Sequence, residues 1–183
     1  MRQTLTLHPE SRCAAAARVE VDVARPRPGG LALTYVVTGA IGDLSLPPAS
    51  APARADGLWR HTCFEAFVRA SPGTAYYEFN LAPSRQWAAY RFGDARKDMS
   101  VANEVDTPGI EVQSDGKFFE LRAALDLDRL PDLSGDAPWR LGLSAVIKEA
   151  GGRLSYWALA HPPGRADFHD AHGFALTLPL TEA

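Results

Sequence analysis

The sequence has few of the features that bind nucleic acids or cross membranes. Its 183 residues carry 22 acidic and 19 basic side chains, a formal net charge of −3, and no run of Lys or Arg is long enough to follow a phosphate backbone. The opening residues lack the basic start and apolar run of a secretion signal, and no apolar stretch approaches the ~20 residues that span a bilayer. We therefore expect a soluble, cytoplasmic protein without a nucleic-acid or membrane partner.

Cysteine is equally scarce. Only Cys13 and Cys63 are present, and their separation is not that of a metal-binding motif. A chain of this length buries roughly 70% of the surface that it exposes when unfolded, so it needs neither disulfides nor metal to fold. We expect one domain over residues 1–183 with two reduced thiols, as in a reducing compartment, and leave a single bridge between them open as the alternative.

Several catalytic and nucleotide-binding signatures are missing as well. No Walker loop, dinucleotide fingerprint or nucleophile elbow is present, because most glycines lie in turns between strand-like runs. The polar segment 93–109 has no glycine-rich cradle that opens a helix, so we expect a solvated loop there and not a phosphate site. The sequence thus gives no sign of a nucleotide-dependent enzyme.

Alternation of apolar and polar residues, by contrast, is abundant. Runs with a period of two recur between turns rich in Gly and Pro, at residues 5–7, 19–23, 31–38, 58–92, 110–113, 117–125, 139–149, 154–161 and 174–180. Helix is limited to a short turn within residues 126–138 and to the other candidate, residues 14–17. We expect an all-β fold of about ten strands, a two-sheet antiparallel β-sandwich with jelly-roll or immunoglobulin-like connections and minimal helix.

Residues 58–92 hold the densest chemistry and predict a three-stranded antiparallel meander. In the second of these strands, Tyr77 and Phe79 alternate with Glu78 and Asn80. Successive side chains of a strand point to opposite faces, so the aromatic pair should face the core and the polar pair the other side. Such a polar face can meet either solvent or a ligand.

The strand faces opposite the core carry groups that suit a sugar. Trp and Tyr rings stack on the C–H faces of a sugar, while Glu, Asn and Lys side chains bond its hydroxyl groups. The register near the start of the meander is open, because either Arg60 and Thr62 or Trp59 and Glu65 face this side. The candidate ligand-binding residues are Trp59, Arg60, Thr62, Glu65, Glu78, Asn80, Trp87, Lys148, Trp157 and His161.

The alternative is a solvated sheet face with cross-strand ion pairs and buried Trp side chains. On that interpretation Lys148 is the cation that sheet pairing brings near Glu78. An exposed ion pair would add little to stability and nothing to function.

Three motifs resemble a known superfamily and together span nearly the whole chain. They are Leu58-Trp59 leading into Thr62-Cys63-Phe64-Glu65-x-Phe67, Tyr77-Glu78-Phe79-Asn80 with Ala82-Pro83-Ser84 and Trp87, and Trp157 through Asp167-Phe168-His169. They resemble the DOMON-like proteins related to family 9 carbohydrate-binding modules. The resemblance implies a β-sandwich with a pocket for sugars or, in other branches, haem. It places Trp59, Glu65, Glu78 and Asn80 on the strands that build the pocket and matches Trp157 to the second stacking Trp of the sugar binders.

A metal site is a rival interpretation. Asp167, His169 and His172 lie close together in the sequence and could hold zinc with His161 or His61. Their spacing matches no established signature, and short polar loops commonly look like this. They are therefore weak candidates.

Haem binding and glycan hydrolysis are two further rivals. Haem needs axial ligands, such as a His pair or a His with Met99. An enzyme would use Glu65 and Glu78 as acid and base, as glycosidases use two carboxyl groups. We expect a non-catalytic domain that binds a small molecule, a sugar first; the sequence identifies no cofactor and no oligomeric state.

Overall fold

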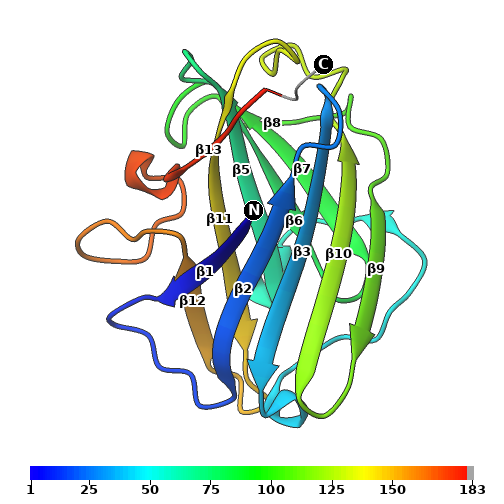
Figure 1. Cartoon of the computed structure of the whole chain (residues 1–183). Helices are drawn as coiled ribbons and strands as arrows, with labels where there is room; N and C mark the ends of the chain where they lie inside the picture. The colour runs from blue at the N-terminus through cyan, green and yellow to red at the C-terminus, as the bar shows by residue number, and fades with distance from the viewer. Residues whose placement is uncertain (181–183) are drawn as a thin grey trace.

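The computed structural model describes residues 1–180, which form thirteen β-strands and no α-helix (Figure 1). The strands are β1 (Arg2–Leu7), β2 (Ala16–Ala24), β3 (Gly30–Gly39), β4 (Ala53–Arg54), β5 (Cys63–Ala70), β6 (Tyr76–Leu81), β7 (Gln86–Phe92), β8 (Ser100–Val101), β9 (Gly109–Ser114), β10 (Phe118–Asp126), β11 (Trp139–Lys148), β12 (Leu154–Ala158) and β13 (Leu176–Leu178). Three short 3₁₀ helices are η1 (Ile41–Asp43), η2 (Leu58–Arg60) and η3 (Ala171–Gly173). No helix in this part of the chain is long and apolar enough to span a bilayer.

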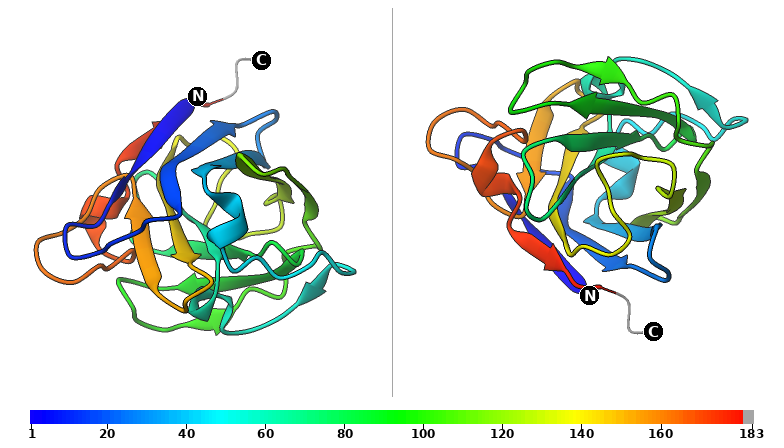
Figure 2. Two further views of the ribbon diagram at one scale, coloured as in Figure 1. Left: turned by 90° about the horizontal axis from the view of Figure 1, so that it is seen from below. Right: turned by 90° about the horizontal axis from the view of Figure 1, so that it is seen from above.

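The strands join into one sheet that curls until its two halves face each other (Figure 2). Its order is β4-β7-β6-β5-β11-β12-β1-β2-β3-β10-β9, with β13 beside β11 and β8 beside β7. Strand β1 joins the halves, because Thr6 and Leu7 pair with β12 whereas residues 2–5 pair with β2. The predicted all-β class is confirmed. The prediction of two separate antiparallel sheets is wrong, since β1 belongs to both halves and β4 pairs with β7 in parallel.

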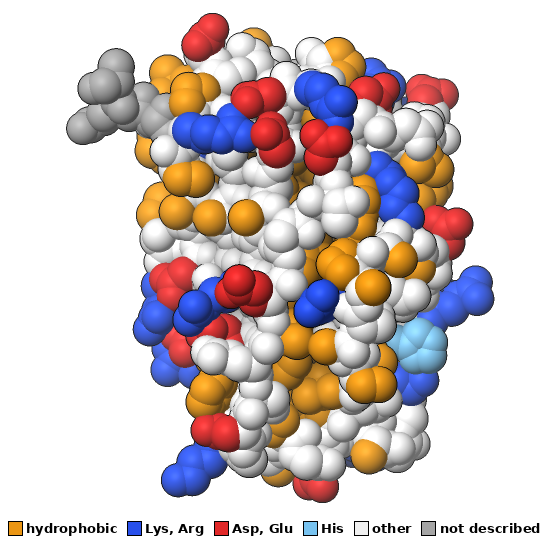
Figure 3. Space-filling view, turned by 90° about the vertical axis from the view of Figure 1, so that its right-hand side faces the viewer, with side chains coloured by type: hydrophobic (Ala, Val, Ile, Leu, Met, Phe, Trp, Pro, Cys, Tyr) orange, Lys and Arg blue, Asp and Glu red, His pale blue; other side chains and the backbone are white. Residues whose placement is uncertain are grey.

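The curl does not close into a barrel. Strands β4 and β9 are the two ends of the sheet path and do not pair with each other. Figure 3 looks at the β9 side of the molecule, where hydrophobic side chains are visible between charged ones. The inward residues of β2, β3 and β10 are buried while their outward neighbours are partly or fully exposed, so the main core lies inside the curl.

The alternation found in the sequence builds this core. Tyr77 and Phe79 are fully buried, as predicted, and the inward residues of β10 lie opposite them in the other half. The ring of Phe64 on β5 stacks on Phe119 of β10 with centroids 5.8 Å apart. The Tyr35 hydroxyl donates a 2.7 Å hydrogen bond to the backbone oxygen of Glu65, which ties β3 to β5 across the core. The period of two therefore fixes which face of each half is inward.

Two local predictions need correction. Trp59 and Arg60 lie in η2 and not on a strand, because Gly57 has a left-handed backbone (φ 73°) that turns the chain before β5 begins at Cys63. Residues 14–17 form no helix, since β2 already begins at Ala16. The loop expected at residues 93–109 is largely irregular, with only the two-residue strand β8 inside it.

Candidate functional site

A cavity of about 410 Å³ lies on the face of β5, β6 and β7 that points away from the main core. A second apolar cluster on this face contains Phe67, Tyr76, Tyr90, Phe92 and Phe174. Five aromatic residues line the cavity itself: Trp59, Tyr90, Phe92, Tyr156 and Phe168. Its polar lining consists of Glu65, Glu78, Arg96 and His169.

The strand register places the two glutamates side by side on the floor of this cavity. Glu65 lies opposite Asn80, and Phe67 lies opposite Glu78, so the two glutamates are diagonal neighbours on one face of β5 and β6. Their side chains are buried, with 3% of Glu65 and 6% of Glu78 exposed. Carboxyl groups buried this deeply need hydrogen bonds, a counter-charge or a proton.

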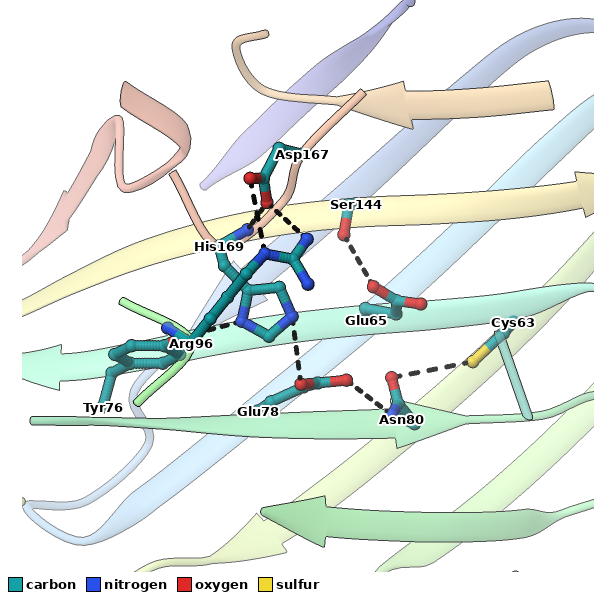
Figure 4. A network of polar contacts seen from close by, with 9 residues as sticks. All are labelled: Cys63, Glu65, Tyr76, Glu78, Asn80, Arg96, Ser144, Asp167 and His169. Carbon is teal, nitrogen blue, oxygen red and sulfur yellow. Dashed lines mark hydrogen bonds and ion pairs between the residues drawn. The ribbon is translucent and has the colours of Figure 1, made fainter. Parts of the chain in front are cut away.

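Glu78 has two partners, both seen in Figure 4. The side-chain amide of Asn80 donates a 2.7 Å hydrogen bond to Oε1, and Nε2 of His169 lies 3.6 Å from Oε2. Asn80 is itself fully buried and accepts a long 3.9 Å contact from the Cys63 thiol. Asn80 therefore supports Glu78 from behind and does not line the cavity.

Within residues 1–180 the Glu65 carboxyl has one weak partner, the Ser144 hydroxyl, which donates to Oε2 at 3.4 Å. Burial, and next the nearby charge of Glu78, raise the pKa of the Glu65 carboxyl well above its usual range. Burial also raises the pKa of Glu78, but the hydrogen bond from Asn80 and the charge of Arg96 oppose that shift. Of the two, Glu65 is thus the group that holds a proton more firmly.

His169 lines the cavity and is uncharged at neutral pH. Burial, and then the charge of Arg96, lower the pKa of His169 to about 4. The Tyr76 hydroxyl accepts the backbone N–H of Arg96 at 3.2 Å and lies 2.8 Å from Nδ1 of His169. A hydroxyl that donates to Nδ1 leaves the imidazole proton on Nε2, which faces Glu78.

Arg96 is held at the rim by its backbone and by Asp167. The Arg96 φ of 55° is in the left-handed region. For a residue other than Gly this backbone conformation costs about 1–3 kcal/mol, so it persists only where surrounding contacts hold it in place. The Arg96 guanidinium bonds Asp167 at 2.7 Å, and both side chains are partly exposed. Loop 93–99 and the segment that precedes η3 are thereby tied together over the cavity (Figure 4).

The structure brings together Trp59, Glu65 and Glu78, with Asn80 directly behind them. Arg60, on η2, is exposed and does not line the cavity. Thr62 does not line the cavity either, because the Thr62 hydroxyl donates to the Ser45 backbone oxygen and accepts the backbone N–H of Lys148.

Lys148 was expected near Glu78, and this prediction is wrong. The Lys148 ammonium lies 3.3 Å from the His61 ring instead. The groups that do lie near Glu78 are His169 and Arg96, and no sequence pattern predicts that position for either of them.

Trp87, Trp157 and His161 lie outside the cavity. Both Trp rings belong to the main core, where the Trp157 indole N–H donates to the Ser155 hydroxyl at 3.1 Å and Arg54 stacks on Trp87. The His161 imidazole donates to the Thr6 carbonyl at 2.8 Å. Their expected position on the ligand face is therefore wrong.

Tyr156 takes the place expected for Trp157. Ser155 and Trp157 both point inward, so the alternation of β12 turns Tyr156 outward to the cavity. The lining residues that sequence reasoning missed are Tyr90, Phe92, Arg96, Met99, Val146, Tyr156, Ala166 and Phe168. Alternation along β7, β11 and β12 could have identified Tyr90, Phe92, Val146 and Tyr156, but the residues in loops leave no such signal.

The weak metal candidates do not form a ligand set. Asp167 pairs with Arg96, His169 turns toward Glu78, and His172 contacts Asp170. Over residues 1–180, no group of three or more His, Cys, Asp or Glu side chains is arranged to hold a metal ion. Cys13 and Cys63 are free and not bridged.

Haem does not fit these residues. The lining contains one His and one Met, His169 and Met99. An axial His needs a nitrogen free to reach the iron, but the nitrogens of His169 face the Tyr76 hydroxyl at 2.8 Å and the Glu78 carboxylate at 3.6 Å. His8 and His161 are two histidines that lie close together. Their rings pack edge to face with centroids 4.8 Å apart, which leaves no space for a macrocycle between them.

The overall fold is similar to those of two solved structures, a candidate carbohydrate-binding protein and a family 9 carbohydrate-binding module, and this is the fold that the sequence motifs predicted. The chain is similar to a candidate carbohydrate-binding protein of Bacteroides uniformis, with a TM-score of 0.70 and 15% identity over 99% of this chain and 86% of that one. It is also similar to a family 9 module of Caldicellulosiruptor kristjanssonii in complex with glucose, with a TM-score of 0.52 and 11% identity over 95% and 81%. No protein-family model and no curated protein matches the sequence. Identities this low establish the fold alone.

Proposed function

We propose that this chain is a non-catalytic carbohydrate-binding domain whose cavity holds a sugar between aromatic walls, on a floor made by Glu65 and Glu78. The observation that supports this most strongly is the cavity itself, which joins two buried carboxyl groups to five aromatic side chains. Related folds include a glucose complex, which makes a sugar the first ligand to test.

Each part of the cavity has a role in this proposal. Ionised Glu78 accepts hydrogen bonds from sugar hydroxyls, and protonated Glu65 can donate one as well as accept. The rings of Trp59 and Tyr156 offer faces for the C–H surface of a pyranose. Trp59 is 39% exposed and its ring meets Tyr90 edge-on with centroids 6.3 Å apart, so a ligand can reach it from solvent.

Glu78→Gln tests this proposal. The substitution keeps the shape of the side chain but replaces a charged acceptor by a neutral amide. Hydrogen bonds to charged groups contribute about 1.5 to 3 kcal/mol, so affinity should fall about ten- to 150-fold. Calorimetric titration with the best ligand from a monosaccharide panel measures the change.

Glu111→Gln is the matched control, because Glu111 is exposed on β9, far along the sheet from β6. It should leave affinity unchanged. Equal affinities of the wild type and Glu78→Gln would remove Glu78 from the site, and failure of every sugar to bind would overturn the proposed function.

Glycosidases also use two carboxyl groups that differ in protonation, so hydrolysis of a glycan is the alternative function. Our proposal expects no release of reducing sugar from a panel of glycans. Release that is lost in Glu65→Gln would replace binding by hydrolysis as the function. The cytoplasmic location expected from the sequence stays a prediction.

A further inference from the structure

The charges around the cavity do not balance. Two buried carboxyl groups form its floor, and Arg96 is the only Lys or Arg among the described residues that line it. Arg96 already has a carboxylate of its own, Asp167, at 2.7 Å. His169 adds no charge at neutral pH, because its pKa is lowered to about 4. The cavity therefore offers more negative than positive charge to a ligand.

Glu65 also has unused hydrogen-bonding capacity. Its Oε2 accepts from Ser144 at 3.4 Å, and among residues 1–180 no donor is bonded to Oε1 (Figure 4). A carboxyl group that is 97% buried and lines a cavity with one oxygen unpaired is arranged for a donor from outside the chain. Lys148, the cation expected there, points to His61 instead.

We propose that the ligand of this cavity is an amino sugar with a free protonated amine, such as glucosamine, whose ammonium group lies against Glu65 and Glu78. This inference rests on the proposed function, because it names the class of sugar that the same cavity takes. An ammonium group has three donors, enough to reach both carboxylates and one further acceptor. Its charge supplies the counter-charge that the floor lacks.

The aromatic walls favour the same ligand. A cation within about 6 Å of a Trp or Tyr ring face is attracted to it, and more strongly where water is excluded. Trp59, Tyr90 and Tyr156 supply such rings around the carboxyl pair. The walls thus serve the sugar ring and its ammonium group together.

Sugars that lack a free ammonium group should bind this cavity more weakly than an amino sugar. N-acetylation removes the positive charge and leaves one donor in place of three. A uronic acid brings a third carboxyl group to a floor that already has two, and Arg96, the one Lys or Arg among the described residues that line the cavity, already pairs with Asp167. Glucose has the hydroxyls but no charge, so it should bind more weakly than glucosamine.

Binding should also release a proton. In the free protein the Glu65 carboxyl holds its proton more firmly than usual, because burial and the nearby charge of Glu78 raise its pKa. An ammonium group replaces that proton as the source of positive charge. Glucose has no charge to replace it with, so its binding should release none.

The test is calorimetric titration of the wild type with glucosamine, glucose, N-acetylglucosamine and glucuronate at pH about 6.5, below the usual pKa of an α-amino group. Each titration is done in two buffers with different ionisation enthalpies. We expect glucosamine to bind at least about tenfold more tightly than glucose, with proton release seen only for glucosamine. Glu65→Gln should reduce glucosamine affinity at least about tenfold and glucose affinity much less, while Glu111→Gln changes neither.

The outcomes separate the two proposals. Glucose or N-acetylglucosamine binding as tightly as glucosamine would overturn the inference and leave the proposed function standing. Preference for glucuronate would overturn it as well and would move recognition to Arg96. Failure of all four sugars to bind would overturn both. The ligand comparison uses the wild type alone, so it does not depend on the folding of a variant.

Discussion

Glu65 gives the free protein a pH dependence that can be measured without any ligand. Its pKa is raised in the folded state above the ordinary value of 4.5, mainly by burial. The folded protein therefore holds this proton more firmly than the unfolded chain does, and the contribution of Glu65 to stability is greatest below pH 4.5. This contribution is lost as pH rises through the raised folded-state pKa.

Glu65→Gln removes the titration and keeps the shape. The variant should gain stability relative to the wild type as pH rises above 4.5, and the two should converge at lower pH. Urea unfolding at pH values between 4.5 and 8 measures the difference. His169 acts in the opposite direction, because its lowered pKa weakens the fold as pH falls from 6.5 to about 4, but it is common to both proteins and cancels. A difference that does not change with pH would contradict the account of Glu65.

The positions of some residues in the site could be predicted from the sequence, and the positions of others could not. Glu78 and Asn80 follow from the period of two in β6, which the buried Tyr77 and Phe79 confirm. Arg96 could not be predicted, because its place over the cavity depends on a left-handed backbone and on Asp167, 71 residues further along the chain. Alternation describes a strand, and it contains no information on how a loop folds back over one.

Several elements meet at Arg25, directly after β2. Its guanidinium lies 3.7 Å from the Trp139 ring centre at the start of β11. It donates 2.8 Å hydrogen bonds to the backbone oxygens of Pro28, Gly135 and Ala137. One buried cation thus joins the β2–β3 turn to the segment between β10 and β11.

Arg25→Met should therefore destabilise the fold by about 2 to 4 kcal/mol, because several carbonyl groups lose a charged donor at once. Chemical unfolding measures the loss. The matched control is Arg122→Met, since Arg122 is 57% exposed and pairs only with Glu120 at the surface, where the expected change is about 0 to 1 kcal/mol. Equal losses in both variants would show that the Arg25 contacts add nothing beyond a surface ion pair.

The register of β12 could not be predicted from its own sequence. Tyr156 and Trp157 are adjacent and both aromatic, so residue type alone does not say which one faces inward. The inward choice follows from pairing, because Trp157 lies opposite Leu7 and Ala145, whose partners extend the main core. Trp59 shows a second limit of this kind. The sequence predicts a strand there, because a single 3₁₀ turn interrupts the alternation too briefly to be recognised.

The whole molecule differs from the expected sandwich through one strand. Alternating runs predict inward and outward faces equally well for two packed sheets and for one curled sheet. The difference lies in β1, which bends so that its first residues pair with β2 and its last two pair with β12. A bend within one strand has no pattern of its own in the sequence, so the fold class was predictable and the continuity of the sheet was not.

The curl also explains why one cavity is present on the outer face of β5 to β7. The inner face is filled by the core, so the polar side chains of these strands face outward, where η2, loop 93–99 and the segment before η3 cover them. The carboxyl pair and the rings of Tyr90, Phe92 and Tyr156 are therefore products of the same alternation that builds the core, whereas Trp59 and Phe168 come from segments outside the strands.

A crystal structure of the protein with the tightest-binding monosaccharide tests the central claim most directly. We predict a sugar in the cavity, with a hydroxyl or ammonium group within hydrogen-bond distance of Glu78 and a ring face against Trp59 or Tyr156. A sugar bound elsewhere on the surface, with the floor at Glu65 and Glu78 untouched, would contradict the account.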